Sequence, residues 1–302
     1  MALKKSSWLA AACCLTLPAA GWQRFEAVQP HMGTLVRITL YARGAAEADA
    51  AFSKAFSRIA ELEEKLSDYK PSSELNRLRC GSPLIVSEDL YSVLETARRI
   101  NAATSGAFDV TLGPAVRLWR QTLLTQQLPD PSRRAAAGAL TGFHLLRLNS
   151  AESTVEMLRC GMQLDLGGIG KGYAATQALL ALQRSGHPRA LVAIAGDLAI
   201  GEPPPGSKTW RIEAQGQVHH LARCSISTSG DKEQFTIIDG IRYSHVLDPK
   251  TGIGAVGARP ATVIANDGAV ADALATALHI GGEPMLPVIE SMHARAILAP
   301  RR

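Results

Sequence analysis

The chain has 302 residues, of which 46% are hydrophobic and 20% are charged, and its formal net charge is +5. This balance is that of a globular protein with a substantial core, which excludes disorder over most of the chain. The modest positive charge is scattered, with no basic run interleaved with aromatic residues, and this argues against a nucleic-acid partner.

The first 20 residues have the layout of a secretory signal. Two lysines precede an apolar stretch over residues 8–17, and small residues follow it. The sequence around Cys13 loosely resembles a bacterial lipoprotein cleavage site, so lipidation at Cys13 and cleavage elsewhere both stay open. We expect residues 1–20 to be a signal peptide or lipoprotein anchor and residues 21–302 to form one domain. The expected location is the periplasm, either free or held at the inner membrane by the N-terminus.

Strand and helix patterns alternate in the first part of this domain. Residues 31–41 alternate as a strand does, and Gly44 opens a helix with an apolar stripe. A polar loop over residues 66–76 follows. Ser87 is placed to cap a second amphipathic helix, which runs to about Ile100.

The rest of the chain is richer in strands. Thr104 to Thr111 predicts a turn with an aromatic residue and a carboxylate, and the polar, alanine-rich residues 123–139 predict a surface excursion. Strand patterns dominate residues 145–164 and 210–238, and the last helix is expected over about 269–280. No internal repeat or flexible linker divides the chain, so we predict a single mixed α+β domain.

Three cysteines lie beyond the signal: Cys80, Cys160 and Cys224. Their number is odd and they lack CxxC spacing, which indicates neither a disulfide framework nor a zinc site. We expect all three to be small buried apolar residues.

The most informative stretch is residues 165–175, here called the glycine loop, in which four glycines and Lys171 lie between strand-like and helix-like patterns. Glycines let the backbone approach a ligand, and the start of a helix points N–H groups at an anion. The glycine loop therefore predicts a phosphate-binding turn to which Lys171 adds a mobile charge.

The glycine loop also allows three other interpretations. A Walker-type loop fails because Asp165 and Gly172 occupy the positions of an essential glycine and hydroxyl. The Gly-x-Gly-x-x-Ala pattern that begins at Gly170 fits a relaxed dinucleotide fingerprint, with residues 191–194 as the next strand and Asp197 as the ribose ligand. A purely structural strand-to-helix turn is the third.

Two further stretches carry groups suited to phosphate chemistry. Asp272 and Thr276 are four residues apart and share one face of the last helix, and such oxygen ligands suit Mg²⁺, although a solvated face is the alternative. His245 lies just before an Asp-Pro turn at the end of a probable strand. It is a candidate general base, with a turn-holding role as the alternative and Asp248 as a second candidate base.

Taken together, these motifs resemble the FAD:protein FMN transferase family, also called ApbE-type. The matching stretches occur in the family's order and are His31–Thr34, Leu66–Asn76, Thr104–Thr111, Asp165–Ala174, Ala195–Asp197, Ser227–Asp231, His245–Gly252 and Ala271–Leu278. The resemblance implies a fold of mixed, largely antiparallel sheet layers packed with helices. It also implies a Mg²⁺-dependent transferase that moves FMN from FAD onto a threonine or serine hydroxyl of an acceptor protein and releases AMP.

The resemblance also implies site residues and partners. The residues implied around FAD are Met32, Tyr69, Ala107, Phe108, Asp109, Asp165, Lys171 and Leu247. The metal is implied at the carbonyl of Gly168 with Asp272 and Thr276, and His245 is implied to activate the acceptor hydroxyl. Acceptors of the family include subunits of membrane respiratory complexes.

The chain departs from the family pattern at three places. Gly170 replaces a usual alanine and Ala195 a common glycine, and since both are small we expect no effect on binding. Ala275 stands where some members carry another acid, which predicts weaker metal affinity. Two other functions stay open: an FAD pyrophosphatase that yields FMN and AMP, and a non-catalytic periplasmic flavin-binding protein.

Overall fold

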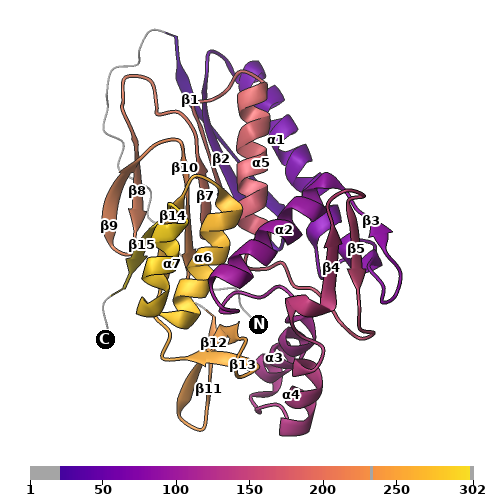
Figure 1. The fold of residues 1–302 in the computed structure, drawn as a ribbon. Coiled ribbons are helices and arrows are strands. Elements are labelled where there is room, and N and C mark those ends of the chain that lie inside the picture. The colour runs from indigo at the N-terminus through magenta and orange to yellow at the C-terminus, as the bar shows by residue number, and fades with distance from the viewer. Residues whose placement is uncertain (1–20, 232–233, 300–302) are drawn as a thin grey trace.

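The computed structural model describes residues 21–231 and 234–299, and Figure 1 shows a mixed α/β fold in which helices cover a large antiparallel sheet. The fold class and the largely antiparallel sheets are confirmed. Residues 1–20, with Cys13, lie outside the described residues, so the signal and the domain division stay predictions. Within the described part, no helix is both long and apolar enough to cross a membrane.

The largest sheet has seven strands, and each neighbouring pair is antiparallel. In spatial order they are β1 (Gln23–His31), β2 (Thr34–Ala42), β6 (Ala190–Ile194), β7 (Asp197–Ile200), β10 (Cys224–Ser229), β14 (Ala261–Ala265) and β15 (Arg295–Leu298). The strand predicted over residues 31–41 is β2. Its hairpin partner β1 was missed because an edge strand with mostly exposed side chains and a proline lacks clear apolar alternation.

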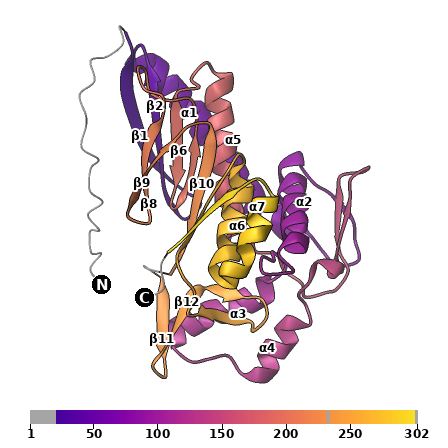
Figure 2. The ribbon, with the colours of Figure 1, turned by 60° about the vertical axis from the view of Figure 1, so that its left-hand side comes forward.

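The helices are α1 (Ala45–Leu66), α2 (Glu88–Ala103), α3 (Gly113–Thr125), α4 (Pro131–Gly138), α5 (Gly170–Arg184), α6 (Gly268–Gly281) and α7 (Leu286–Ser291), with 3-10 turns η1 (Leu75–Arg77), η2 (Phe143–Leu145) and η3 (Glu283–Met285). Of these, α1, α5 and α6 pack on one face of the large sheet, as Figures 1 and 2 show. As predicted, α1 follows Gly44, and the Ser87 hydroxyl caps α2 by accepting from the Leu90 amide. Side chains such as Ile59 and Leu274 are completely buried between helices and sheet, which stabilises the fold by about 1.5–3 kcal/mol each.

Three smaller sheets complete the fold. They comprise β3 (Leu84–Ile85), β5 (Thr154–Met157) and β4 (Leu146–Asn149); β8 (Trp210–Ala214) and β9 (Gln217–Leu221); and β11 (Phe235–Ile238), β12 (Ile241–Asp248) and β13 (Ile253–Val256). Helices α3 and α4 pack on β11–β13 through a separate apolar cluster that includes Trp119, Tyr243 and Leu247. Figure 2 shows β12 and α3 below α6. Strand β12 contacts both of these helices.

Two stretches differ from the prediction. Residues 123–139 are largely exposed, as expected, but they include the end of α3 and all of α4, which Asp130 caps. The strand expected to reach residue 164 ends earlier, because β5 stops at Met157 and the chain turns at Gly161 with φ +93°. The glycine loop thus follows an irregular segment and not a strand.

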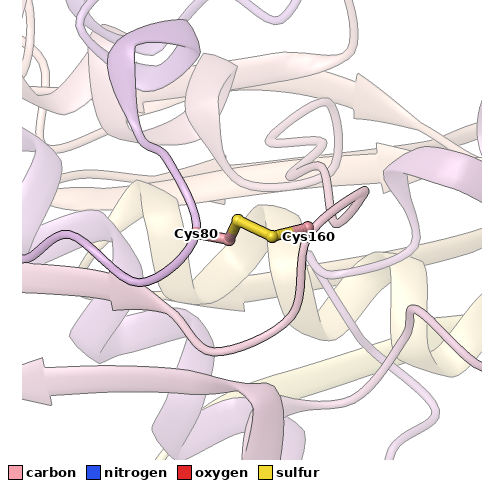
Figure 3. Close-up of a disulfide and its surroundings, with 2 residues drawn as sticks. All are labelled: Cys80 and Cys160. Atoms are coloured by element: carbon pink, nitrogen blue, oxygen red, sulfur yellow. A yellow bond between two sulfur atoms is a disulfide. The ribbon is translucent and has the colours of Figure 1, made fainter.

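The prediction for the cysteines is wrong for two of the three. Cys80 and Cys160 form a disulfide, shown in Figure 3, with Cα atoms 4.9 Å apart and a sequence separation of 80. Cys80 reaches its partner because its segment bridges to Met157 at the end of β5. The 80-residue separation left no spacing motif that could have revealed this bond. Among the described residues Cys224 is a free thiol, and it is half-buried where a buried residue was expected.

Candidate active site

The glycine loop is the point at which the other predicted site segments meet. A Cβ added to Gly168 would lie 2.9 Å from the Thr276 hydroxyl on α6 and 3.3 Å from the Phe108 ring. A Cβ on Gly170 would lie 3.9 Å from the terminal carbon of Met32. Four segments distant in sequence thus converge at the N-terminus of α5.

Lys171 lies in the first turn of α5 among carboxylates. Its ammonium donates to the Gly167 carbonyl at 2.6 Å and lies 4.0 Å from the nearer carboxylate oxygen of Asp197. Burial lowers the pKa of Lys171, but Asp272, Asp197 and Asp165 outweigh this effect and raise it. Lys171 is therefore charged at neutral pH and provides the positive centre of the site.

The helices α5 and α6 cross at two glycines. A Cβ on Gly172 would lie 2.0 Å from the Gly268 carbonyl oxygen, and a Cβ on Gly268 would lie 2.2 Å from the Gly172 carbonyl oxygen. Because neither residue has a side chain, the Gly172 amide can donate to the Asp272 carboxylate at 3.1 Å. In the same way the Gly167 amide donates to Asp165 at 2.7 Å. The Gly167 and Gly172 amides therefore bind carboxylates of the protein itself.

Asp272 is buried, with 5% of its surface exposed, and does not lie on a solvated helix face. Burial and the nearby charge of Asp197 raise its pKa to about 8, although Lys171 and the Gly172 amide act in the opposite direction. A buried carboxylate of this kind is stabilised by a bound cation.

The predicted metal-holding groups are brought together. The Thr276 hydroxyl lies one helical turn from Asp272 and beside Gly168. The three residues present a carboxylate, a hydroxyl and a main-chain carbonyl, which is the hard oxygen set that Mg²⁺ takes. Asp272 supplies the carboxylate of this set, and no cluster of three or more His, Cys, Asp or Glu suited to a metal occurs in residues 21–231 and 234–299.

Asp197 begins β7 and faces the same buried region. The Ser227 hydroxyl donates to it, and burial raises its pKa. The dinucleotide-binding hypothesis, in which Asp197 holds a ribose, is wrong because β6 is antiparallel to both β2 and β7. A dinucleotide-binding βαβ unit requires parallel strands.

Tyr69 is 72% exposed and lies in a loop that is fixed by its own polar residues. The Asn76 amide donates to the carbonyls of Ser67, Asp68 and Lys70 at 3.2, 3.0 and 2.9 Å. The matched residues around Tyr69 therefore act by fixing the loop, and Tyr69 itself stays available to a ligand.

Arg120, on α3, was missed by the sequence analysis. Its guanidinium donates to Asp68 at 2.7 Å and to Asp165 at 2.8 Å, and its carbon lies 4.2 Å from the centre of the Tyr69 ring. Burial and the charge of Asp68 raise the pKa of Asp165, while Arg120 lowers it. The partners are far from Arg120 in sequence, so no local pattern could have revealed the cluster.

The turn after α2 forms a buried corner. Ala107 and Phe108 are buried, and the Asn101 amide donates to the Phe108 carbonyl at 2.7 Å. The Asp109 carboxylate accepts from the Thr111 amide at 2.7 Å and from its hydroxyl at 2.6 Å. Burial raises the pKa of Asp109, the hydrogen bonds notwithstanding. In this structure Asp109 shapes the turn, and its predicted contact with FAD stays a prediction.

His245 lies on β12, just before the Asp248 turn, as predicted. Its Nδ1 donates to the Gln234 carbonyl at 3.0 Å, which leaves Nε2 as the basic nitrogen. Burial lowers the pKa of His245, so the ring is neutral at neutral pH. The next residue but one, Leu247, is buried against α3 and does not line an open surface.

The position of β12 depends on a second histidine. His279, on α6, donates from Nδ1 to the Arg259 carbonyl at 2.8 Å, and its Nε2 accepts from the Ser244 hydroxyl at 3.1 Å. Burial lowers the pKa of His279, consistent with this neutral arrangement. No motif in the sequence marks His279.

Known proteins share the fold and the sequence pattern of this chain. The structure of the Pseudomonas stutzeri flavinyl transferase ApbE superposes with a TM-score of 0.83 at 28% identity, covering 95% of this chain and 94% of that one. The Vibrio cholerae flavin transferase ApbE gives 0.81 at 27% identity, covering 92% and 93%. A Treponema pallidum FAD:protein FMN transferase is 32% identical over 83% of this chain and 77% of its own length. The ApbE family model matches residues 32–298, and the chain therefore belongs to the ApbE family.

Proposed function

We propose that this protein transfers FMN from FAD to a serine or threonine hydroxyl of an acceptor protein and releases AMP. The observation that carries the proposal is the grouping of charged Lys171 and buried Asp272 at the N-terminus of α5 with neutral His245 on β12, which is near enough for the charge of Lys171 to lower its pKa, in a chain of the ApbE family. Relatives at 30–34% identity carry the name FAD:protein FMN transferase, which supports the same reaction here.

The reaction needs charge neutralisation and a base. The acceptor oxygen forms a bond to the FMN phosphorus, the bond from that phosphorus to the bridging oxygen breaks, and the electron pair leaves with AMP. The Lys171 ammonium offsets negative charge that develops on the pyrophosphate. The free Nε2 of His245 takes the proton of the acceptor hydroxyl, since Nδ1 is held by Gln234.

We further propose that Asp272, Thr276 and the Gly168 carbonyl hold Mg²⁺. The buried carboxylate with a raised pKa supports this assignment, because a cation would offset the cost of its negative charge. When bound, the ion supplies Lewis-acid stabilisation of phosphate oxygens.

The proposed location is outside the cytoplasm. The signal-like residues 1–20 support export, and the Cys80–Cys160 disulfide supports it independently, since disulfides persist mainly in oxidising compartments. A membrane-bound respiratory subunit is a suitable acceptor there, whether the N-terminus is lipidated or cleaved.

The test is to incubate the purified protein with FAD, Mg²⁺ and a candidate acceptor and to weigh the denatured acceptor by mass spectrometry. A covalent increase equal to one FMN residue, with AMP in equal amount, is the expected result. FMN and AMP without a mass increase, using an acceptor that a related transferase modifies, would favour the pyrophosphatase. Unchanged FAD would favour the flavin-binding protein.

A further inference from the structure

Two adjacent residues of α3 contact different parts of the site, one the strand β12 and the other the loops that carry Asp68 and Asp165. The Trp119 ring is buried and its Nε1 donates to the Ser244 carbonyl of β12 at 3.1 Å, next to His245. Arg120 faces the other way, toward Asp68 and Asp165. One helix thus contacts both the strand of the proposed base and the loop that carries Tyr69.

The Arg120 contacts join two separate loops. Asp68 belongs to the loop over residues 66–76, and Asp165 begins the glycine loop. Each carboxylate takes one terminal nitrogen of the same guanidinium, and the guanidinium carbon lies over the Tyr69 ring. Without Arg120 the two carboxylates would repel one another, and the Tyr69 ring would lose the group that packs against it.

A disulfide joins the segments next to these two loops. Cys80 follows the loop over residues 66–76, and Cys160 shortly precedes the glycine loop (Figure 3). The disulfide restrains the backbone at Cys80 and Cys160, which lie outside the two loops. Arg120 is the group that orients side chains within the loops.

We propose that Arg120 is a positioning residue for FAD: by bridging Asp68 and Asp165 and packing on Tyr69, it holds the two loops in the arrangement that binds the dinucleotide. The inference rests on the proposed function. A planar guanidinium is required, because a lysine ammonium can offset the charge of the carboxylates but cannot bridge both and cover a ring at once.

The experiment measures FMN transfer and FAD affinity for Arg120→Ala and Arg120→Lys. The matched control is Arg117→Ala, one turn earlier on α3, where the arginine is exposed. We expect Arg120→Ala to raise the KM and the Kd for FAD about 10-fold, with kcat at saturating FAD within about 3-fold, and Arg120→Lys to recover only part of the affinity. Arg117→Ala should leave both unchanged. An unchanged KM and Kd in Arg120→Ala would overturn the proposal, as would a loss confined to kcat.

A double-mutant cycle tests the bridge itself. If Arg120 acts through Asp68, the effects of Arg120→Ala and Asp68→Asn on the Kd for FAD are not additive, whereas additive effects would overturn the bridge.

Trp119→Phe should change the other kinetic constant. We expect a lower kcat with little change in the KM for FAD, because the substitution removes the hydrogen bond that holds the His245 strand. Calorimetric FAD binding needs no acceptor, so a wild-type protein that binds FAD but transfers nothing would refute the transferase and leave the Arg120 test intact. Should Arg120→Ala fail to fold, Arg120→Lys and Asp68→Asn decide.

Discussion

The two walls of the site are built differently. The wall at the start of α5 has its charged groups buried against main chain and against one another, as in Asp272 with the Gly172 amide. The wall that carries His245 is a small three-stranded sheet supported by α3, and β11 forms one of its edges. A buried wall suits a small charged ligand, and an accessible edge suits a partner protein. We therefore expect the wall at the start of α5 to control the binding of FAD and of the metal. We expect the wall that carries His245 to control proton transfer from the acceptor.

Asp272→Ala should give the largest effect and tests the buried wall. Removal of the proposed carboxylate ligand leaves the pyrophosphate uncompensated, and FMN transfer should fall by about 10³-fold or more. The fold should survive, because Asp272 is not part of the apolar core and accepts a hydrogen bond from the Gly172 amide. Turnover is measured by mass spectrometry over a range of Mg²⁺ concentrations; wild-type turnover throughout would refute the metal assignment. Asp267→Ala, at the cap of the same helix, is a control for helix stability alone.

The disulfide should contribute the next largest effect, on stability. Replacing Cys80 and Cys160 by serine removes a cross-link between residues separated by 80 positions, which should lower the free energy of unfolding by about 3 kcal/mol. Urea unfolding of the double variant checks this value. Cys224→Ser is the matched control, and equal stabilities of the two variants would show that the bond does not form.

His245→Asn tests the accessible wall. Asparagine keeps a group that can reach the Gln234 carbonyl but lacks the basic nitrogen, so transfer should slow by about 10²-fold while the Kd for FAD stays the same. Single-turnover transfer and calorimetric binding are the measurements. His220→Asn, on exposed β9, should behave as wild type. If the variant loses affinity for FAD but transfers FMN at the normal rate when FAD is saturating, His245 is a ligand contact. In that case the two walls do not divide FAD binding and proton transfer between them.

The smallest effect concerns the pH dependence of stability. The raised folded-state pKa of Asp272, about 8, means that the metal-free folded protein holds a proton that the unfolded chain has released. This contribution to stability is fully present at acid pH and is lost as the pH rises toward 8. Thermal melting without metal should therefore show a decline of a few degrees in wild type relative to Asp272→Asn over this window. Added Mg²⁺ should restore stability at high pH; parallel melting curves of the two proteins would contradict the assignment.

Local features were accessible from the sequence. The Ser87 cap, the start of α1, the shared helix face of Asp272 and Thr276, and the place of His245 before its turn follow from spacing within one or two helical turns or one strand. The edge strand β1 and the helix α4 were missed, because their side chains are mostly exposed and carry little apolar periodicity.

Contacts between distant segments were decided by the tertiary structure alone. The Cys80–Cys160 bond, the Arg120 bridge and the His279 support of β12 each join residues whose separation leaves no periodic signal. The antiparallel direction of β6 and the burial of Asp272 likewise arise only when strands pair and α5 meets α6. Residue type and spacing determine which chemistry is available and where helices begin. Protonation states and ligand contacts depend on desolvation and on neighbouring charges, which exist only once the chain has packed.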